Sequence, residues 1–129
     1  MAKQYIQIQN EFVQKYKIVL DPKSSCRRRT HAHIKERRIC KWCQKNSVRS
    51  TFDLLHEIGH IETTKSSMRR CEAEFYATQW AIDRASEYGI AVPEPVIKVY
   101  QDYIDLELAR GVRRHGKGYN LNLNLKVGD

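Results

Sequence analysis

Two histidines four residues apart, His56 and His60, enclose Glu57 in the sequence His-Glu-Ile-Gly-His. Residues at this spacing lie on one face of an α-helix, one turn above the other. Two imidazoles placed in this way can bind one zinc ion, and the glutamate beside the metal can take a proton from metal-bound water. The motif therefore predicts a helix with a zinc site on one face. The alternative is a polar helix face whose histidines are hydrogen-bonded or solvated.

The residues around the motif also fit a helix. Ser50 or Thr51 is placed to cap its N-terminus, and Asp53 then falls in the first turn, where the helix dipole favours an acid. The polar stretch 63–67, Thr-Thr-Lys-Ser-Ser, ends the helix. Its apolar side is formed by Phe52, Leu55, Ile58 and Gly59.

A second helix, predicted over about residues 69–88, offers a third metal ligand. A catalytic zinc usually has three protein ligands and one open position. A turn of about six residues lets this helix fold back antiparallel, so either Glu72 or Glu74 can approach the metal. Glu74 shares the register of the inward-facing residues, whereas Glu72 lies off that register and fits a solvated first-turn acid. The inward-facing residues are Ala77, Trp80 and Ala81.

The rest of the chain predicts a few more elements. A helix is expected over residues 4–17, one or two strands with a turn within 26–43, and a last helix from Pro93 or Pro95 to about Gly111. The alternating Asn and Leu residues that begin at Asn120 predict an edge strand or a disordered tail.

These elements predict a small α+β fold with three to four helices and a short antiparallel or mixed sheet. The zinc site is expected between the motif helix and the helix that follows it. The length of 129 residues fits a single domain over 1–129, with 112–129 as a flexible tail.

The composition is that of a soluble globular protein. Hydrophobic residues make up 41% of the chain, charged residues 29%, and the mean hydropathy is −0.66. No apolar run approaches the roughly 20 residues that cross a bilayer, and the N-terminus lacks the apolar core of a secretion signal. We therefore expect a cytoplasmic protein that does not associate with membranes.

The net charge of +8 comes from one segment. Residues 23–49 hold ten Lys or Arg and a single acid, Glu36, for a net +9, whereas the other 102 residues hold 13 basic and 14 acidic residues, for a net −1. Such a cluster attracts nucleic acid or an acidic protein partner. It equally fits a strand pair with solvated basic outer positions.

The chain has four cysteines, which are Cys26, Cys40, Cys43 and Cys71. Disulfides are not expected to persist in the cytoplasm. Cys40 and Cys43 have the spacing of a zinc-binding or redox pair, but a single pair favours free, partly buried thiols. A second zinc site at this pair would have to recruit Cys26, Cys71, His31 or His33.

Over about residues 48–85 the sequence resembles the ImmA/IrrE-type zinc metallopeptidases. That family has the pattern Thr-Leu-Ala-His-Glu-Leu-Gly-His, followed by a helix with Glu-x-x-Ala-x-x-Phe-Ala. The matching residues here are Thr51-Phe-Asp-Leu-Leu-His56-Glu57-Ile-Gly-His60 and then Glu74-x-x-Ala77-x-x-Trp80-Ala81. The chain departs from the family at Thr78, where Asn is common, and it lacks the Leu-Met-Pro ending. The cysteine pair and the basic segment are not family features.

The resemblance implies a zinc-dependent endopeptidase with a gluzincin-like ligand set. His56, His60 and Glu74 would bind one Zn²⁺ per chain, and Glu57 would be the general base that activates water for peptide-bond hydrolysis. Members of the family commonly cleave a helix-turn-helix repressor, often from a prophage or mobile element. The expected substrate is therefore a DNA-bound repressor or another regulatory protein, which the basic segment 23–49 would help to approach.

Two roles at the site stay open. The donor that stabilises the oxyanion is expected among His31, His33, Tyr76, Tyr88 and His115. Thr78, one helical turn after Glu74, is expected to hold the Glu74 carboxylate.

Two other functions compete with a peptidase of this type. A non-catalytic module would bind nucleic acid or a protein partner through segment 23–49, but a structural zinc site needs a fourth ligand, and the sequence offers no obvious one. A protease that repairs DNA–protein crosslinks also combines this motif with a basic surface. Its third ligand is usually a histidine, and no histidine occurs between His60 and His115.

Overall fold

The computed structural model describes residues 4–22, 30–115 and 120–124. The elements follow in the order α1 (Tyr5–Lys15), β1 (Val19–Asp21), β2 (His31–His33), β3 (Arg38–Cys40), α2 (Val48–Thr63), α3 (Arg70–Glu87) and α4 (Glu94–His115). The fold is a small α+β domain in which four helices accompany a three-stranded sheet within the described residues. The predicted fold class is confirmed.

The three strands form a mixed sheet in the order β1–β3–β2. β1 pairs with β3 in parallel, and β2 pairs with β3 antiparallel, so the mixed alternative is the one that forms. The strands and turn expected within 26–43 are β2, β3 and the residues between them. Leu20, Ala32 and Ile39 are paired across the strands and pack against the core on one face of the sheet. β2 forms an edge of this sheet.

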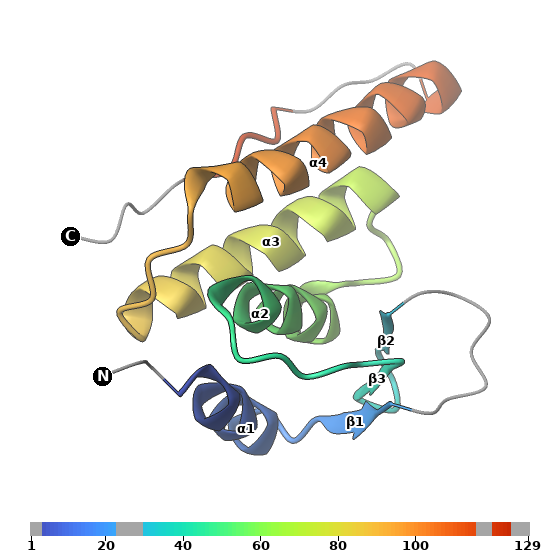
Figure 1. The fold of residues 1–129 in the computed structure, drawn as a ribbon. Coiled ribbons are helices and arrows are strands. Elements are labelled where there is room, and N and C mark those ends of the chain that lie inside the picture. Colours follow the sequence, from blue (N-terminus) through green and yellow to red (C-terminus); the bar gives the residue numbers. More distant parts are fainter. Residues whose placement is uncertain (1–3, 23–29, 116–119, 125–129) are drawn as a thin grey trace.

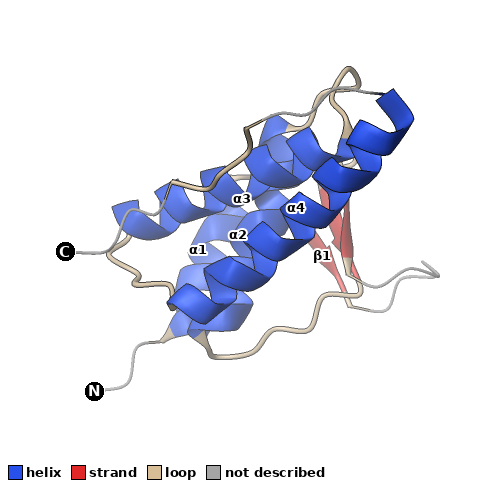
Figure 2. Ribbon diagram, turned by 90° about the horizontal axis from the view of Figure 1, so that it is seen from above, coloured by secondary structure: helices blue, strands red, loops and turns tan. Residues whose placement is uncertain are grey.

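The four helices lie side by side, and the sheet lies at one end of them (Figure 1, Figure 2). α2 packs against α1, α3 and β2, and α3 packs in turn against α4. The core is centred on α2, because the largest buried side chains of that helix meet those of its neighbours. These α2 side chains are Phe52, Leu54, Leu55 and Ile58. The motif helix is therefore the central element of the fold.

α2 begins earlier than the sequence predicts. Its N-cap is Ser47, whose hydroxyl accepts a hydrogen bond from the Ser50 amide at 3.0 Å. Thr51, one of the two predicted caps, uses its hydroxyl differently: it donates to the Ser47 carbonyl oxygen at 2.8 Å and accepts from the Gln9 side chain at 3.0 Å. Asp53 consequently lies beyond the first turn. Several Ser and Thr residues can cap here, and packing against α1 decides between them.

The other helix ends show one agreement and one difference. α3 begins and ends within a residue of the expected limits, and Gly89 follows it with φ of 67°, a conformation that glycine adopts without strain. α4 does not end near Gly111 but continues to His115. A glycine inside a helix costs only about 1 kcal/mol, so tertiary packing readily carries the helix through it.

The segment 120–124 forms no strand and packs along α3 and α4. Leu121 is buried, and Gln101 on α4 donates to the Leu121 carbonyl at 3.0 Å and accepts from the Leu123 amide at 2.8 Å. The period-two pattern thus reflects leucines that face the helices. The residues of the expected tail that lie outside the described part of the chain are 116–119 and 125–129.

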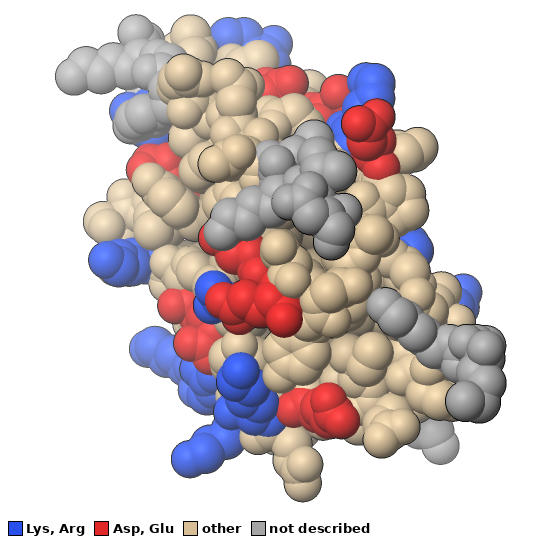
Figure 3. Space-filling model, turned by 90° about the vertical axis from the view of Figure 1, so that its left-hand side faces the viewer, with Lys and Arg blue, Asp and Glu red and all other residues tan. Residues whose placement is uncertain are grey.

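The surface on the left of Figure 1 carries acidic and basic side chains intermixed (Figure 3). This agrees with the balanced charge of the chain outside residues 23–49. None of the helices in the described residues combines the length and apolar character of a membrane span.

Candidate metal centre

A close approach of two helices creates the site. Gly59 lies inside the His-Glu-Ile-Gly-His motif, and a Cβ atom at this position would lie 2.4 Å from the carbonyl oxygen of Ala77 on α3. Because glycine has no side chain, the two backbones can pass this close to each other. Ala77 and Ala81 are small and fully buried, which keeps the interface narrow. The contact brings the first half of α3 directly over the motif.

His56, His60 and Glu74 meet at this interface. Glu74 Oε2 lies 3.1 Å from Nε2 of His56 and 3.2 Å from Nε2 of His60. One potential ligand atom from each residue lies within 4.8 Å of the others. His56 is buried, and the other two side chains are partly buried. The structure therefore brings together the three residues predicted as metal ligands.

Two threonine hydroxyls orient the imidazole rings. Thr78 donates to the Glu74 carbonyl oxygen at 2.7 Å, so its oxygen is available to accept from Nδ1 of His56, which lies 3.0 Å away. Thr64 Oγ1 lies 3.3 Å from Nδ1 of His60. A neutral ring that donates through Nδ1 carries its lone pair on Nε2. Thr78 was expected to hold the Glu74 carboxylate. It bonds instead to the Glu74 backbone and to His56.

The converging atoms fit a metal ion. Two imidazole lone pairs and a carboxylate oxygen repel one another unless a proton or a cation lies among them. Two histidines and a glutamate form a known ligand set of catalytic zinc, with a fourth position left open. Nitrogen and oxygen donors of this kind suit a divalent transition metal. The residues present therefore fit a zinc ion.

The local electrostatics favour a negative Glu74. Burial raises its pKa, but hydrogen bonds to His56 and His60 outweigh burial and hold the pKa of Glu74 well below its usual range. For His60 the directions are opposite: burial lowers its pKa, but the interaction with Glu74 outweighs burial, so the pKa of His60 is raised. The site thus keeps a carboxylate ionised where it can attract a cation.

The three residues open into a cleft of about 680 Å³. Glu57, the residue after His56, lines the same cleft, and burial raises the pKa of its carboxyl group. His31 of β2 also lines it and interacts electrostatically with Glu57. A second cleft, of about 710 Å³, lies between α4 and residues 122–123 and contains none of the predicted site residues.

α4 adds side chains that the sequence analysis did not predict. The ring of Tyr100 lies 4.6 Å from that of His56, between centroids, and its hydroxyl donates to the Asp53 carboxylate. Burial, and then the Asp53 charge, raises the pKa of Tyr100 above its usual range. Tyr103 accepts from the Arg70 guanidinium at 3.2 Å on the same cleft. In the sequence these residues belong only to an apolar helical pattern, which does not indicate that α4 lines the cleft.

The residues expected as oxyanion donors lie in different parts of the structure. His31 lines the cleft, and the ring of His33 is 4.6 Å from that of His31. Tyr88 instead packs on Phe12 in the core, with ring centroids 4.5 Å apart, and Tyr76 lines a separate hollow. Neither tyrosine is among the residues that line the cleft. The side chain of His115 is outside the described part of the structure.

Cys40 and Cys43 lie in different surroundings and do not converge on one site. Cys40 is buried, whereas Cys43 is exposed. Cys71 is free and buried, and Cys26 lies outside the described residues. A second group of metal-ligating side chains nevertheless contains Cys40, together with His31 and His33. Cys43 is not part of this group.

Comparison with known proteins found no match to a family model, to a curated protein or to a solved structure. A functional assignment therefore rests on the geometry of the site and on the pattern of the motifs.

Proposed function

We propose that the protein is a zinc-dependent endopeptidase that uses Glu57 as its general base. The observation that carries this proposal is the convergence of His56, His60 and Glu74 between α2 and α3, with Glu57 in the same cleft. Three protein donors beside an open cleft are typical of a catalytic rather than a structural zinc site. The resemblance of these residues to the ImmA/IrrE-type metallopeptidases supports the same assignment.

The side chains divide the chemistry among them. A zinc ion held by the three ligands supplies Lewis-acid chemistry, since it lowers the pKa of water to about 7 and polarises a carbonyl group. Glu57 takes a proton from the attacking water and passes it to the leaving amine. Burial raises the pKa of Glu57, which suits a carboxylate that must hold this proton between the two steps. His31 and Tyr103 line the cleft as candidate hydrogen-bond donors to the substrate.

The position of β2 supports an extended peptide as the substrate. β2 is an edge strand, and Thr30, His31 and Ala32 line the cleft. An extended peptide can add to such an edge through main-chain hydrogen bonds. The proposal that the natural substrate is a DNA-bound repressor of a prophage or mobile element rests on the family resemblance alone.

No observation on the described residues favours the alternative, a nucleic-acid-binding module. Three arginines of the basic segment are engaged within the molecule: Arg37 with Glu62, Arg38 with Asp21 and Arg49 with Asp53. Four other basic residues of this segment lie outside the described part of the chain, at positions 23 and 27–29, and the remaining three, Lys35, Lys41 and Lys45, lie within it. Binding of nucleic acid through segment 23–49 stays a prediction.

Glu57→Gln tests the proposal directly. The amide cannot accept a proton, so hydrolysis should be lost while zinc binding is retained. Zinc-loaded wild-type protein and the variant are incubated with a proteome-derived peptide mixture, and new peptide ends are read by mass spectrometry. Glu72→Gln, a matched change on α3 outside the site, should cleave like the wild type. Cleavage that is equal with Glu57→Gln, or absent with the zinc-loaded wild type, would contradict the proposal.

Elemental analysis tests the ligand set separately. Glu74→Ala should bind about one zinc per chain less than the wild type, because it removes one of three ligands. Glu57→Gln should show no such loss.

A further inference from the structure

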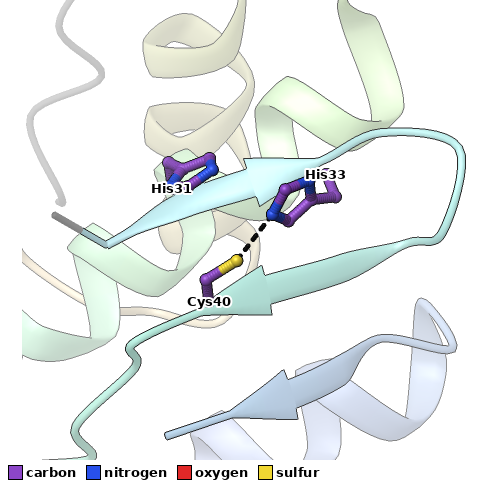
Figure 4. A group of neighbouring side chains, drawn as sticks. All are labelled: His31, His33 and Cys40. Carbon is purple, nitrogen blue, oxygen red and sulfur yellow. Dashed lines mark hydrogen bonds between the residues drawn. The ribbon is translucent and has the colours of Figure 1, made fainter. Parts of the chain in front are cut away.

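The hairpin formed by β2 and β3 gathers a second set of metal-ligating side chains (Figure 4). His31 and His33 are two residues apart on β2 and therefore point to the same face of the strand. Cys40 is paired directly with His31 across the two strands. One donor atom from each of the three residues lies within 4.8 Å of the others.

The alternation along the strands places Cys40 on the face opposite to Ala32 and Ile39. Ala32 and Ile39, which alternate with the three residues along the strands, pack against the core on the other face of the sheet. Cys40 is fully buried, yet its Sγ lies 2.6 Å from Nε2 of His33. A buried thiol that serves as a small apolar side chain does not require imidazoles around it. Two imidazoles and a thiol on one face form a set of potential metal ligands.

We propose that His31, His33 and Cys40 bind a second zinc ion. Thiolate and imidazole are the ligands that Zn²⁺ prefers, whereas Mg²⁺ and Ca²⁺ require oxygen. Donors that share a tetrahedral zinc at about 2.0–2.3 Å lie roughly 3.5 Å apart, so small side-chain rotations bring the present atoms to that spacing. The site is not the pair of Cys40 and Cys43 that the sequence spacing offers, since Cys43 is exposed and outside the group.

The second site would connect the hairpin to the cleft. His31 belongs to the second group and also lines the cleft with His56 and Glu57. A metal ion on the hairpin therefore fixes the ring of His31 and the edge strand that carries it. The proposal does not depend on peptidase activity, because its ligands are separate from those between α2 and α3.

Cobalt provides the test, because it replaces zinc and reports its own ligands. A cobalt–thiolate bond gives a near-ultraviolet charge-transfer band, and His56, His60 and Glu74 offer no sulfur. The full chain, freed of metal, is titrated with Co²⁺ under reducing conditions. The band should appear in the wild type and in Cys43→Ser, the matched control on the same segment. It should also remain in Glu74→Ala, which disables the first site alone.

Two variants keep the proposal falsifiable. Cys40→Ser should lose the band, and His33→Gln, at a partly buried position, should weaken cobalt binding at this site by at least roughly tenfold. The proposal is overturned if the wild type binds cobalt without the band, if the band follows Cys43, or if His33→Gln leaves the affinity unchanged. A loss of peptidase activity in Glu57→Gln has no bearing on this result, so the two proposals fail independently.

Discussion

Thr78 is the residue that joins the two helices chemically. Its hydroxyl donates to the Glu74 backbone on α3 and accepts from His56 Nδ1 on α2. Thr78→Val keeps the shape but leaves the buried Nδ1–H of His56 without this partner. Zinc affinity should fall about 10–100-fold, the usual effect of removing a hydrogen-bond partner behind a metal-binding histidine. Competition with a chromogenic chelator measures the change.

Thr64→Val is the matched control for this prediction. Thr64 is the partner of His60 Nδ1, just as Thr78 is the partner of His56 Nδ1. The Thr64 oxygen is farther from the ring nitrogen, at 3.3 Å, and Thr64 follows the end of α2. Its replacement should weaken zinc binding less than Thr78→Val. Equal affinities of Thr78→Val and the wild type would show that the hydroxyl does not orient the ring.

At the scale of elements, the approach of α2 and α3 depends on Gly59. Gly59→Ala would place a Cβ atom 2.4 Å from the Ala77 carbonyl oxygen, and a backbone atom cannot rotate away. Overpacking of this kind typically costs about 1–3 kcal/mol, and the shifted helices should also weaken zinc binding. Thermal unfolding and a zinc titration measure the two effects.

Gly111→Ala, the same substitution at another glycine, is expected not to destabilise the protein. Gly111 lies within α4, and a Cβ atom there would meet only Cys71 Sγ, at 3.9 Å, which is an ordinary contact. Alanine favours a helix by up to about 1 kcal/mol over glycine. The variant should therefore be as stable as the wild type or more so. If both variants lose stability equally, the close approach at Gly59 is not the cause.

The elements also show what local sequence can predict. The spacing of His56 and His60 and the register of Glu74 are helical properties, so the ligand set followed from residues close in sequence. The cap of α2 was expected at Ser50 or Thr51 but is Ser47, and the hydroxyl of Thr51 is engaged with Gln9 on α1 instead. Local signals are reliable where the helix geometry alone sets the distance.

The whole molecule determines the rest of the site. The cleft is lined by β2, α2, α3 and α4, whose residues range from Thr30 to Tyr103. Tyr100 and Tyr103 line the cleft because α4 packs against α3, and His31 does so because β2 packs against α2. The spacing of residues within one helix or strand cannot predict these contacts, since they depend on how the helices and the sheet pack against one another.

Metal binding should stabilise the whole fold, because the ligands come together only in the folded chain. Binding to the native state alone adds about 2.7 kcal/mol at a free zinc concentration of 100 times the dissociation constant. For a chain of this size, that corresponds to a rise in Tm of roughly 10 °C for each occupied site. A chelator should therefore lower the Tm of the zinc-loaded protein, as differential scanning calorimetry can measure.

Variants measure how much each of the two groups of ligands contributes to the change in Tm on addition of chelator. Each is compared with itself, with and without chelator, so that a change in the stability of the metal-free chain cancels. Glu74→Ala should retain only the contribution of His31, His33 and Cys40, and Cys40→Ser only that of the site between α2 and α3. The two contributions should add up to approximately the wild-type shift, because the two groups have no ligand in common. A wild-type Tm that does not respond to chelator would mean that neither group binds zinc in the folded state.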